Sequence, residues 1–129
     1  MIVETSALIA ILFEEDDAEK FRQAIASAPV RRMSAANYVE AGIVIDSQKN
    51  PLASGRVDEF LTRASIEIEG VTASQAKIAR QAYRDFGKGS GHPAKLNFGD
   101  CFAFALAVET GEPLLYKGDD FTHTGINPV

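Results

Sequence analysis

Short apolar runs alternate along this chain with longer stretches in which apolar residues recur every three or four positions. A short apolar run between breaks is typical of a buried parallel strand, and the helical spacing is typical of amphipathic helices that cover a sheet. The predicted strands are residues 1–3, 30–33, 66–68 and 113–116, and the predicted helices are residues 7–12, 18–28, 35–48, 57–64, 73–86 and 99–109.

Helix caps, prolines and glycines separate these elements. Thr5 or Ser6 is expected to cap the first helix, Pro29 ends the second, and Asn50-Pro51 breaks the chain after the third. Residues 87–97 contain three glycines and a proline without an apolar period, so we expect a mobile loop there. The last few residues are expected to add a fifth strand at an edge of the sheet.

The alternation of strands and helices predicts a single α/β domain that spans residues 1–129. It has three layers, in which helices cover both faces of a central, mostly parallel sheet of four or five strands. In such sheets the ligand crevice lies beyond the carboxyl ends of the strands, where the strand order reverses. Residues just after a strand, or in the first turns of the next helix, are therefore the candidates for a functional site.

Composition agrees with one globular domain in a reducing compartment. Of the 129 residues, 46% are hydrophobic and 24% are charged, an ordinary balance for a chain that buries a core. The one cysteine, Cys101, excludes an internal disulfide and is expected to be a small buried residue. The sequence has no signal-peptide pattern and no apolar run of membrane-spanning length, so we expect a cytoplasmic protein with no membrane partner.

The net charge of −5 argues against a protein that coats nucleic acid through a broadly basic surface. Much of the negative charge is accounted for if several acids share one site. The basic residues occur in local groups, which a small nuclease can place around an acidic centre. These groups are Arg31 with Arg32, then Lys88, His92 and Lys95, and then Lys117.

Four acidic segments mark the predicted carboxyl end of the sheet. Glu4 follows the first strand, Glu40 lies among apolar neighbours in the third helix, and Asp100 is in the first turn of an almost entirely apolar helix. Asp119 and Asp120 share the glycine turn after the fourth strand. Each acid also has a structural interpretation: a helix-dipole role for Glu4, an N-cap role for Asp100, pairing for Glu40, and turn chemistry for the aspartate pair.

Carboxylates that converge in one cleft repel one another and lose solvation, and they usually coexist by binding a hard divalent cation. The sequence therefore predicts a metal-dependent hydrolase of phosphate esters. A phospho-receiver domain shares the length, the α/β alternation and an acidic Mg²⁺ pocket, but it needs an aspartate at the end of its third strand. Residues 66–72 contain none, which makes this alternative the weaker one.

Four segments resemble, in order and spacing, the motifs of the PIN-domain family, and specifically of the VapC-type toxins of bacterial toxin–antitoxin pairs. They are MIVETSALIAIL, NYVEAGIV, LNFGDCFAFALA and GEPLLYKGDDFTHTGI, and the resemblance covers essentially the whole chain. It implies an endoribonuclease that depends on Mg²⁺ or Mn²⁺ and acts on RNA. It also implies a cognate VapB-type antitoxin whose C-terminal segment binds and inhibits the toxin, and a homodimer.

The resemblance also assigns roles to individual residues. Glu4 and Asp100 are expected to be the primary metal ligands. Glu40 and the fourth acid, Asp119 or alternatively Asp120, are expected to bind a second ion or to orient water. The remaining expected contributors are Thr5 and Ser6 as the hydroxyls beside the first acid, and Lys88, His92, Lys95 and Lys117 as contacts to RNA.

One residue departs from the family pattern, because Glu4 stands where Asp-Thr-Ser is usual. Glutamate keeps the charge but extends the carboxylate by one methylene, and Mg²⁺ tolerates little deviation from octahedral geometry. We therefore expect weakened cleavage, with a catalytically silent protein that still docks the antitoxin as the alternative. Apolar residues on three helices are either core or a groove for that antitoxin segment: Phe13, Phe21, Phe60 and Leu61.

Overall fold

A four-stranded parallel sheet lies at the centre of the computed structural model, which describes all 129 residues. The strands are β1 (Ile2–Val3), β2 (Arg32–Ser34), β3 (Glu67–Glu69) and β4 (Leu114–Leu115), in the spatial order β3-β2-β1-β4. After β3 the chain returns past β1 to place β4 on its other side. The switch point of the sheet therefore lies between β1 and β4.

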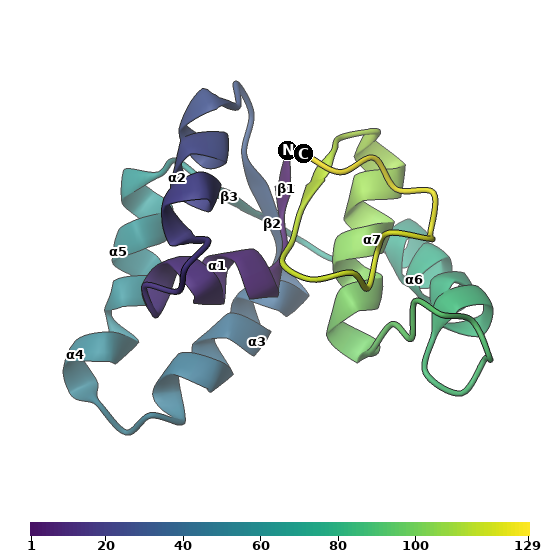
Figure 1. Cartoon of the computed structure of the whole chain (residues 1–129), viewed down its shortest axis with the longest axis horizontal. Helices are drawn as coiled ribbons and strands as arrows, with labels where there is room; N and C mark the ends of the chain where they lie inside the picture. The colour runs from purple at the N-terminus through teal and green to yellow at the C-terminus, as the bar shows by residue number, and fades with distance from the viewer.

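Seven helices complete the three layers (Figure 1). In that view α1 to α5 lie on one side of the sheet, and α6 and α7 lie on the other. Their bounds are α1 (Thr5–Leu12), α2 (Ala18–Ser27), α3 (Ala35–Asp46), α4 (Pro51–Ser54), α5 (Arg56–Arg63), α6 (Ala73–Phe86) and α7 (Phe98–Thr110). The predicted fold class, a three-layer α/β/α domain around a parallel sheet, is confirmed.

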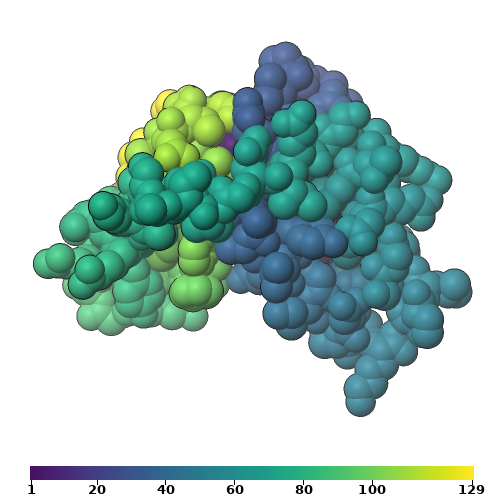
Figure 2. Space-filling model, turned by 180° about the vertical axis from the view of Figure 1, so that it is seen from behind, coloured from purple at the N-terminus to yellow at the C-terminus, as the bar shows by residue number.

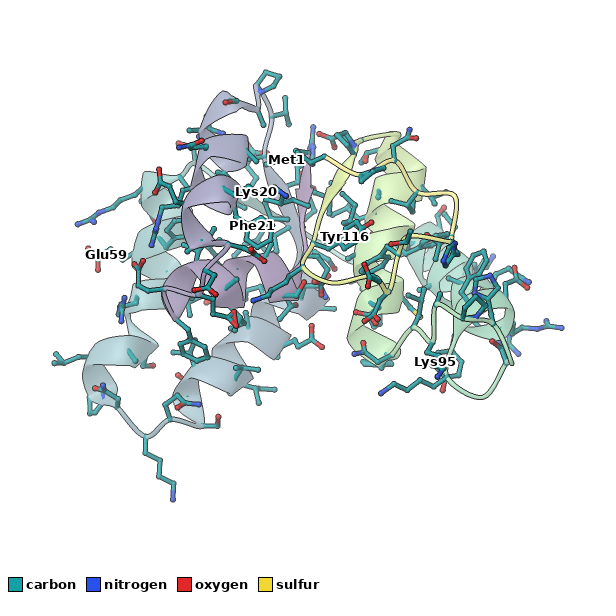
Figure 3. The ribbon with its side chains drawn as sticks, in the orientation of Figure 1. Met1, Lys20, Phe21, Glu59, Lys95 and Tyr116 are labelled. Atoms are coloured by element: carbon teal, nitrogen blue, oxygen red, sulfur yellow. The ribbon has the colours of Figure 1, made fainter.

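Two apolar cores occupy the two faces of the sheet, because successive side chains of a strand point to opposite faces. Val3 and Leu115 pack into the core formed with α1, α2, α3 and α5, and Ile2 and Leu114 pack into the core formed with α6 and α7. Phe21 belongs to the first core and points from α2 towards the sheet (Figure 3). Since the strands are only two or three residues long, helix packing supplies most of both cores.

Several predicted boundaries and caps differ from the structure. The second strand begins at Arg32 rather than at residue 30, because the chain after Pro29 is still partly exposed and Val30 keeps 41% of its surface. Thr5 begins α1 instead of capping it, and the cap is Glu4. Pro51 does not merely break the chain, because its fixed backbone angle suits the first position of α4.

The C-terminal residues do not form the fifth strand predicted from the sequence. Pro128 makes only an isolated bridge to Leu114, since proline has no N–H with which to continue a ladder. Residues 87–97 lack helix and strand as predicted, and the buried Leu96 anchors the end of this loop through backbone bonds to Phe86 and Lys88. None of the helices combines the length and the apolar character that a membrane span requires.

From behind, the connection between the two sides of the molecule is visible (Figure 2). Residues in the sixties and seventies, which include β3, cross the middle of this face between the α3–α5 side and the α6–α7 side. Below this crossing the surface is notched between the two sides. The fold thus leaves the ends of α3 and α7 next to each other without a further layer over them.

Candidate active site

An acidic cleft of about 270 Å³ opens where β1 and β4 end. It collects residues that are far apart in the sequence, because parallel strands deliver the following residues to the same edge of the sheet. The predicted residues that line it are Glu4, Thr5, Ser6, Glu40, Asp100, Lys117 and Asp120. The structure therefore brings together one acid from each of the four acidic segments.

Glu4 leaves β1 as the N-cap of α1. Its Oε2 accepts a hydrogen bond from the backbone N of Ser6 at 2.7 Å and another from the Ser6 hydroxyl. The side chain is almost completely buried, with 3% of the residue exposed. Burial raises the pKa of Glu4 to about 7, and the negative charges of Asp100 and Glu40 add to this effect.

Glu40 is held in the middle of α3 by two neighbours. The Thr5 hydroxyl donates to its Oε1, and Asn37 Nδ2 lies 3.3 Å from the same oxygen. Asn37 is fully buried and also donates to the backbone oxygen of Gly99 at 3.0 Å. A Cβ atom on Gly99 would overlap the Glu40 carboxylate, so the absence of a side chain at Gly99 lets α3 and α7 approach at the site.

Asp100 is fixed by a capping box at the start of α7. Its backbone N donates to Asn97 Oδ1 at 2.9 Å, and its Oδ2 accepts from the Asn97 backbone N at 2.9 Å. Burial raises the pKa of Asp100 to about 6; the charges of Asp120 and Glu40 raise it further, while the Asn97 hydrogen bond and Lys88 oppose the shift. Asn97, and not Asp100 as predicted, is the N-cap of α7; Asp100 completes the capping box from the third helical position and also lines the cleft.

Glu4, Glu40 and Asp100 share one arrangement of their oxygens. Each carboxylate uses one oxygen in the hydrogen bonds described above and leaves the other, Glu4 Oε1, Glu40 Oε2 or Asp100 Oδ1, without a protein partner. None of them takes part in an ion pair, since Lys117 in the same cleft pairs instead with Glu15 at 3.3 Å. The expected ion-pair partner of Glu40 is thus absent.

The free carboxylate oxygens of the cleft are candidate ligands for the divalent cation that the sequence predicts. The donor set fits, because hard cations prefer oxygen ligands and because Glu4, Glu40 and Asp100 form no ion pair with a cationic side chain. Hydrogen bonds that orient ligand carboxylates are also usual around metal sites. The side chains do not form a finished cage, since no three acidic, histidine or cysteine side chains are grouped closely enough to hold an ion. Binding therefore requires the free oxygens to converge.

The structure separates the two aspartates that the sequence could not. Asp120 lines the cleft and acts on the pKa of Asp100, whereas Asp119 does not line the cleft. Lys88, His92 and Lys95 also lie outside it. Lys88 is nevertheless close enough for its charge to lower the pKa of Asp100.

Sequence reasoning missed three residues that support the acids: Asn37, Asn97 and Gly99. Asn97 had a signal, because an asparagine three positions before an aspartate at a helix start is the pattern of a capping box. Asn37 and Gly99 had none, since their contact joins two helices that only the tertiary fold brings together. Cys101 is buried as predicted, and burial, followed by the charge of Asp100, raises the pKa of its thiol to about 11.

Fold and cleft together define an α/β domain with an acidic site at the topological switch point. The PIN domain family matches residues 1–127 of the chain. The chain belongs to the PIN-domain family. Ribonuclease VapC28 of Mycobacterium tuberculosis is 59% identical over 126 residues, which cover 98% of this chain and 95% of that protein. Ribonuclease VapC42 of the same organism is 52% identical over 129 residues, which cover 100% of this chain and 98% of that protein.

Solved structures share the fold at much lower identity. The crystal structure of Mycobacterium tuberculosis VapC20, described as a Sarcin-Ricin loop cleaving toxin, matches with a TM-score of 0.77 at 20% identity and covers 99% of this chain and 97% of that one. VapBC2 from Rickettsia felis, bound to a DNA fragment from its promoter, matches with a TM-score of 0.76 at 16% identity over 98% of this chain and 94% of that one. At these identities the likeness extends to the fold alone.

Proposed function

We propose that this chain is a VapC-type toxin, a metal-dependent endoribonuclease that cleaves RNA phosphodiester bonds. The observation that carries this proposal is the cleft in which Glu4, Glu40 and Asp100 each keep one oxygen without a partner. Full-length relatives named ribonucleases support the choice of RNA among phosphate esters.

In this proposal Asp100 and Glu4 hold Mg²⁺ or Mn²⁺ through their free oxygens. A bound ion of this kind lowers the pKa of a water molecule and neutralises charge on the phosphoryl oxygens. Glu40 and Asp120 face the same space and orient water or accept its proton. Lys117, which lines the cleft with 37% of its side chain exposed, contacts the phosphate backbone.

Glu4 gives a physical reason for weakened activity. Its longer side chain folds back to cap α1 and is almost completely buried. An aspartate is an equally good N-cap but would place its free oxygen differently. Since a misplacement of about 1 Å in a catalytic constellation can cost about 100-fold in rate, we expect this chain to cleave RNA slowly.

A cognate antitoxin is the proposed regulator, and its candidate site is a groove of about 230 Å³ formed with α1 and α5. The groove has apolar residues, among them Leu12 and Phe60, together with three arginines and two glutamates. Two of the arginines pair with these glutamates, and Arg56 makes no ion pair, so the groove suits an amphipathic segment that places an acidic residue near Arg56. Phe21 and Leu61 are core residues, and Phe13 is 44% exposed. A structural relative, a toxin–antitoxin complex from Klebsiella pneumoniae, agrees with this type of partner.

A homodimer is also proposed. Val39 and Ile43 are 56% and 64% exposed on the outer face of α3. Two such side chains one turn apart form an apolar stripe that a second copy would bury.

A catalytically silent binding protein is the second candidate, and the engagement of Glu4 in the helix cap favours it. The two functions are separated by incubating the purified chain with labelled RNA, first with EDTA and then with added Mg²⁺ or Mn²⁺. We expect slow cleavage that EDTA abolishes and either ion restores. Sequencing of the RNA ends identifies the cleavage site.

The Glu4→Asp variant tests the role of the extra methylene. We expect its rate to rise by about 10- to 100-fold. Glu112→Asp is the matched control, because it removes the same methylene outside the cleft and leaves the rate unchanged. Metal-independent cleavage, or no cleavage by either Glu4 form with either ion, contradicts the proposed function.

A further inference from the structure

An apolar pocket of about 290 Å³ lies between α6 and α7 and shares no residue with the acidic cleft. Arg80 and Tyr83 line it from α6, and Phe98, Cys101 and Phe102 line it from α7, with two alanines of α6 completing the wall. Small alanine side chains leave the space between the helices open. The pocket is therefore hydrophobic on almost every side, with Arg80 as the charged member.

Two aromatic side chains of this pocket are open to solvent. Phe98 is 77% exposed and Tyr83 is 45% exposed, and Phe98 does not belong to the core between the sheet and α7. Phe98 is nevertheless held in place, because it packs edge-to-face against Phe102 with ring centroids 4.8 Å apart. The backbone of Gly87 lies against Tyr83 so closely that a side chain there would overlap the ring.

The segment that forms α6 and the loop before α7 is basic, in contrast to the chain as a whole. Residues 73–97 contain five lysines or arginines and one acid, whereas the whole chain has a net charge of −5. All five basic side chains are exposed, and none takes part in an ion pair. Figure 3 shows one of them, Lys95, at the end of the molecule where α7 begins. The five are Lys77, Arg80, Arg84, Lys88 and Lys95.

The pocket and the acidic cleft lie on different sides of the first turn of α7. Phe98 and Asp100 are two positions apart and therefore point roughly 200° apart around the helix. Asn97 and Asp100 line the cleft, and Phe98 and Cys101 line the pocket. The two sites therefore lie on opposite sides of the amino end of α7, within a few residues of each other along the chain.

We propose that this pocket binds an unpaired nucleobase of the RNA, with Phe98 as the stacking surface and Arg80 beside the phosphate backbone. The inference rests on the proposed function and adds a substrate subsite next to the reacting phosphate. Single-stranded nucleic acids are bound by this combination of exposed aromatic rings and a positively charged track. The bound base belongs to a nucleotide near the scissile bond, and it must be unpaired to enter.

Charge favours RNA over a second copy of this chain as the occupant. In a symmetric dimer the same patch meets itself, so the basic residues around the pocket would face one another and repel. RNA instead supplies an apolar base and a negative backbone in one ligand, which matches both features of the patch.

The absence of tryptophan from the chain provides a direct test. Phe98→Trp in an Asp100→Asn background gives a protein with one tryptophan, and we expect it to cut RNA at least about 100-fold more slowly. We expect its fluorescence to fall when a short single-stranded RNA oligonucleotide of mixed sequence is added. We expect a much smaller change with an oligonucleotide of the same length that carries abasic sites, and with double-stranded RNA.

Affinity measurements in the same background complete the test. Phe98→Ala is expected to raise the Kd for the oligonucleotide by roughly 5- to 100-fold, the range that loss of one stacked base produces. Val108→Ala is the matched control, since Val108 is 46% exposed at the other end of α7. The Kd of this variant for the oligonucleotide should not change. Light scattering at the same concentrations reports the oligomeric state.

Three outcomes overturn the proposal: equal Kd values for the Phe98 and Val108 variants, equal quenching by intact and abasic RNA, or no binding of RNA. A loss of affinity that accompanies dissociation of a dimer also overturns it and assigns the pocket to a second copy. Cleavage by the chain with Asp100 intact is measured separately. The proposed function therefore fails or stands independently of this pocket.

Discussion

Acidic side chains at the two ends of the parallel sheet differ in their partners and in the direction in which their pKa is shifted. Where the strands begin, Glu112 contacts the amino group of Met1 at 2.8 Å and Arg32 Nε at 2.9 Å. Burial alone raises the pKa of Glu112, but the hydrogen bond and charge of the amino group, together with Arg32, lower it overall. Where the strands end, Glu4 and Asp100 have no cationic partner, and burial raises the pKa of both.

The comparison of Glu112 with Glu4 and Asp100 indicates that the partners of an acid, more than its burial, distinguish a structural role from a candidate functional one. Glu112 closes a charge network and leaves nothing for a ligand. The acids of the cleft are oriented by neutral donors, so each keeps one oxygen available. Shifted pKa values gathered in a cleft are typical of functional sites, and the paired end of the sheet supplies an internal control for every test of the unpaired end.

Asp100→Asn should have the largest effect on activity. The asparagine keeps an oxygen for the Asn97 N–H, so the helix cap survives while the charge is lost. We expect RNA cleavage to fall by at least about 100-fold and the melting temperature to stay the same or to rise, because one uncompensated buried charge disappears. Gel analysis of labelled RNA and thermal unfolding followed by circular dichroism measure the two effects. Retained cleavage would remove Asp100 from the site.

Gly99→Ala should come next and should affect both stability and activity. The added Cβ overlaps the Glu40 carboxylate, so α7 or Glu40 must move. We expect a loss of about 1–3 kcal/mol of stability and a decrease in cleavage of about tenfold or more. Gly42→Ala in α3 is the matched control, because nothing lies within 4 Å of its Cβ position. It should gain about 0.5–1 kcal/mol with no change in cleavage.

The aspartate pair gives a smaller but sharper comparison. Asp120→Asn removes a charge from the cleft, and we expect cleavage to fall by about tenfold. Asp119→Asn alters the adjacent exposed residue outside the cleft and should change the rate by less than about twofold. Initial rates of RNA cleavage by both variants at identical ion concentrations show which aspartate is the fourth acid of the site. If the two effects are reversed, Asp119 is the fourth acid.

Glu112→Gln should have the smallest effect, and on stability only. Because the folded state lowers the pKa of Glu112, its ionised form stabilises the protein at neutral pH, and this contribution is lost as the pH falls through the lowered pKa. We expect the variant to lose about 0.5–1 kcal/mol at pH 7. The difference from the unsubstituted chain should vanish in acid. Urea unfolding at several pH values tests this; a constant difference across the series contradicts it.

The sequence was sufficient for the fold class because local patterns carry it. The apolar runs and helical periods predict all four strands and six of the seven helices. The short α4 is not predicted, because Pro51 is both a helix breaker and a good first helical residue. The predicted fifth strand does not form, because Pro128 has no N–H with which to continue the pairing. Boundaries of two-residue strands are set by pairing with neighbours, which no single segment encodes.

The sequence was sufficient to predict the acids of the candidate site, but not the residues that hold them in place. Asp100 and Glu4 stand next to clear strand and helix boundaries, so their placement followed from topology. Asp119 and Asp120 are equivalent in sequence, and only the turn after β4 decides which one faces the cleft. The contact between Asn37 and Gly99 spans 62 positions, and the pocket at Phe98 arises from two helices that pack together only in the folded chain.

The hydrogen bonds that occupy one oxygen of each cleft acid also bear on which ions the site can select. A carboxylate with one oxygen engaged in hydrogen bonds most readily offers a metal its other oxygen. Ca²⁺ gathers six to eight oxygens and often takes both oxygens of a carboxylate, whereas Mg²⁺ keeps several waters and is satisfied by one or two carboxylate contacts. In the proposed metal site, the caps of α1 and α7 would therefore favour the single-oxygen contacts that suit Mg²⁺ over the two-oxygen contacts that Ca²⁺ often makes.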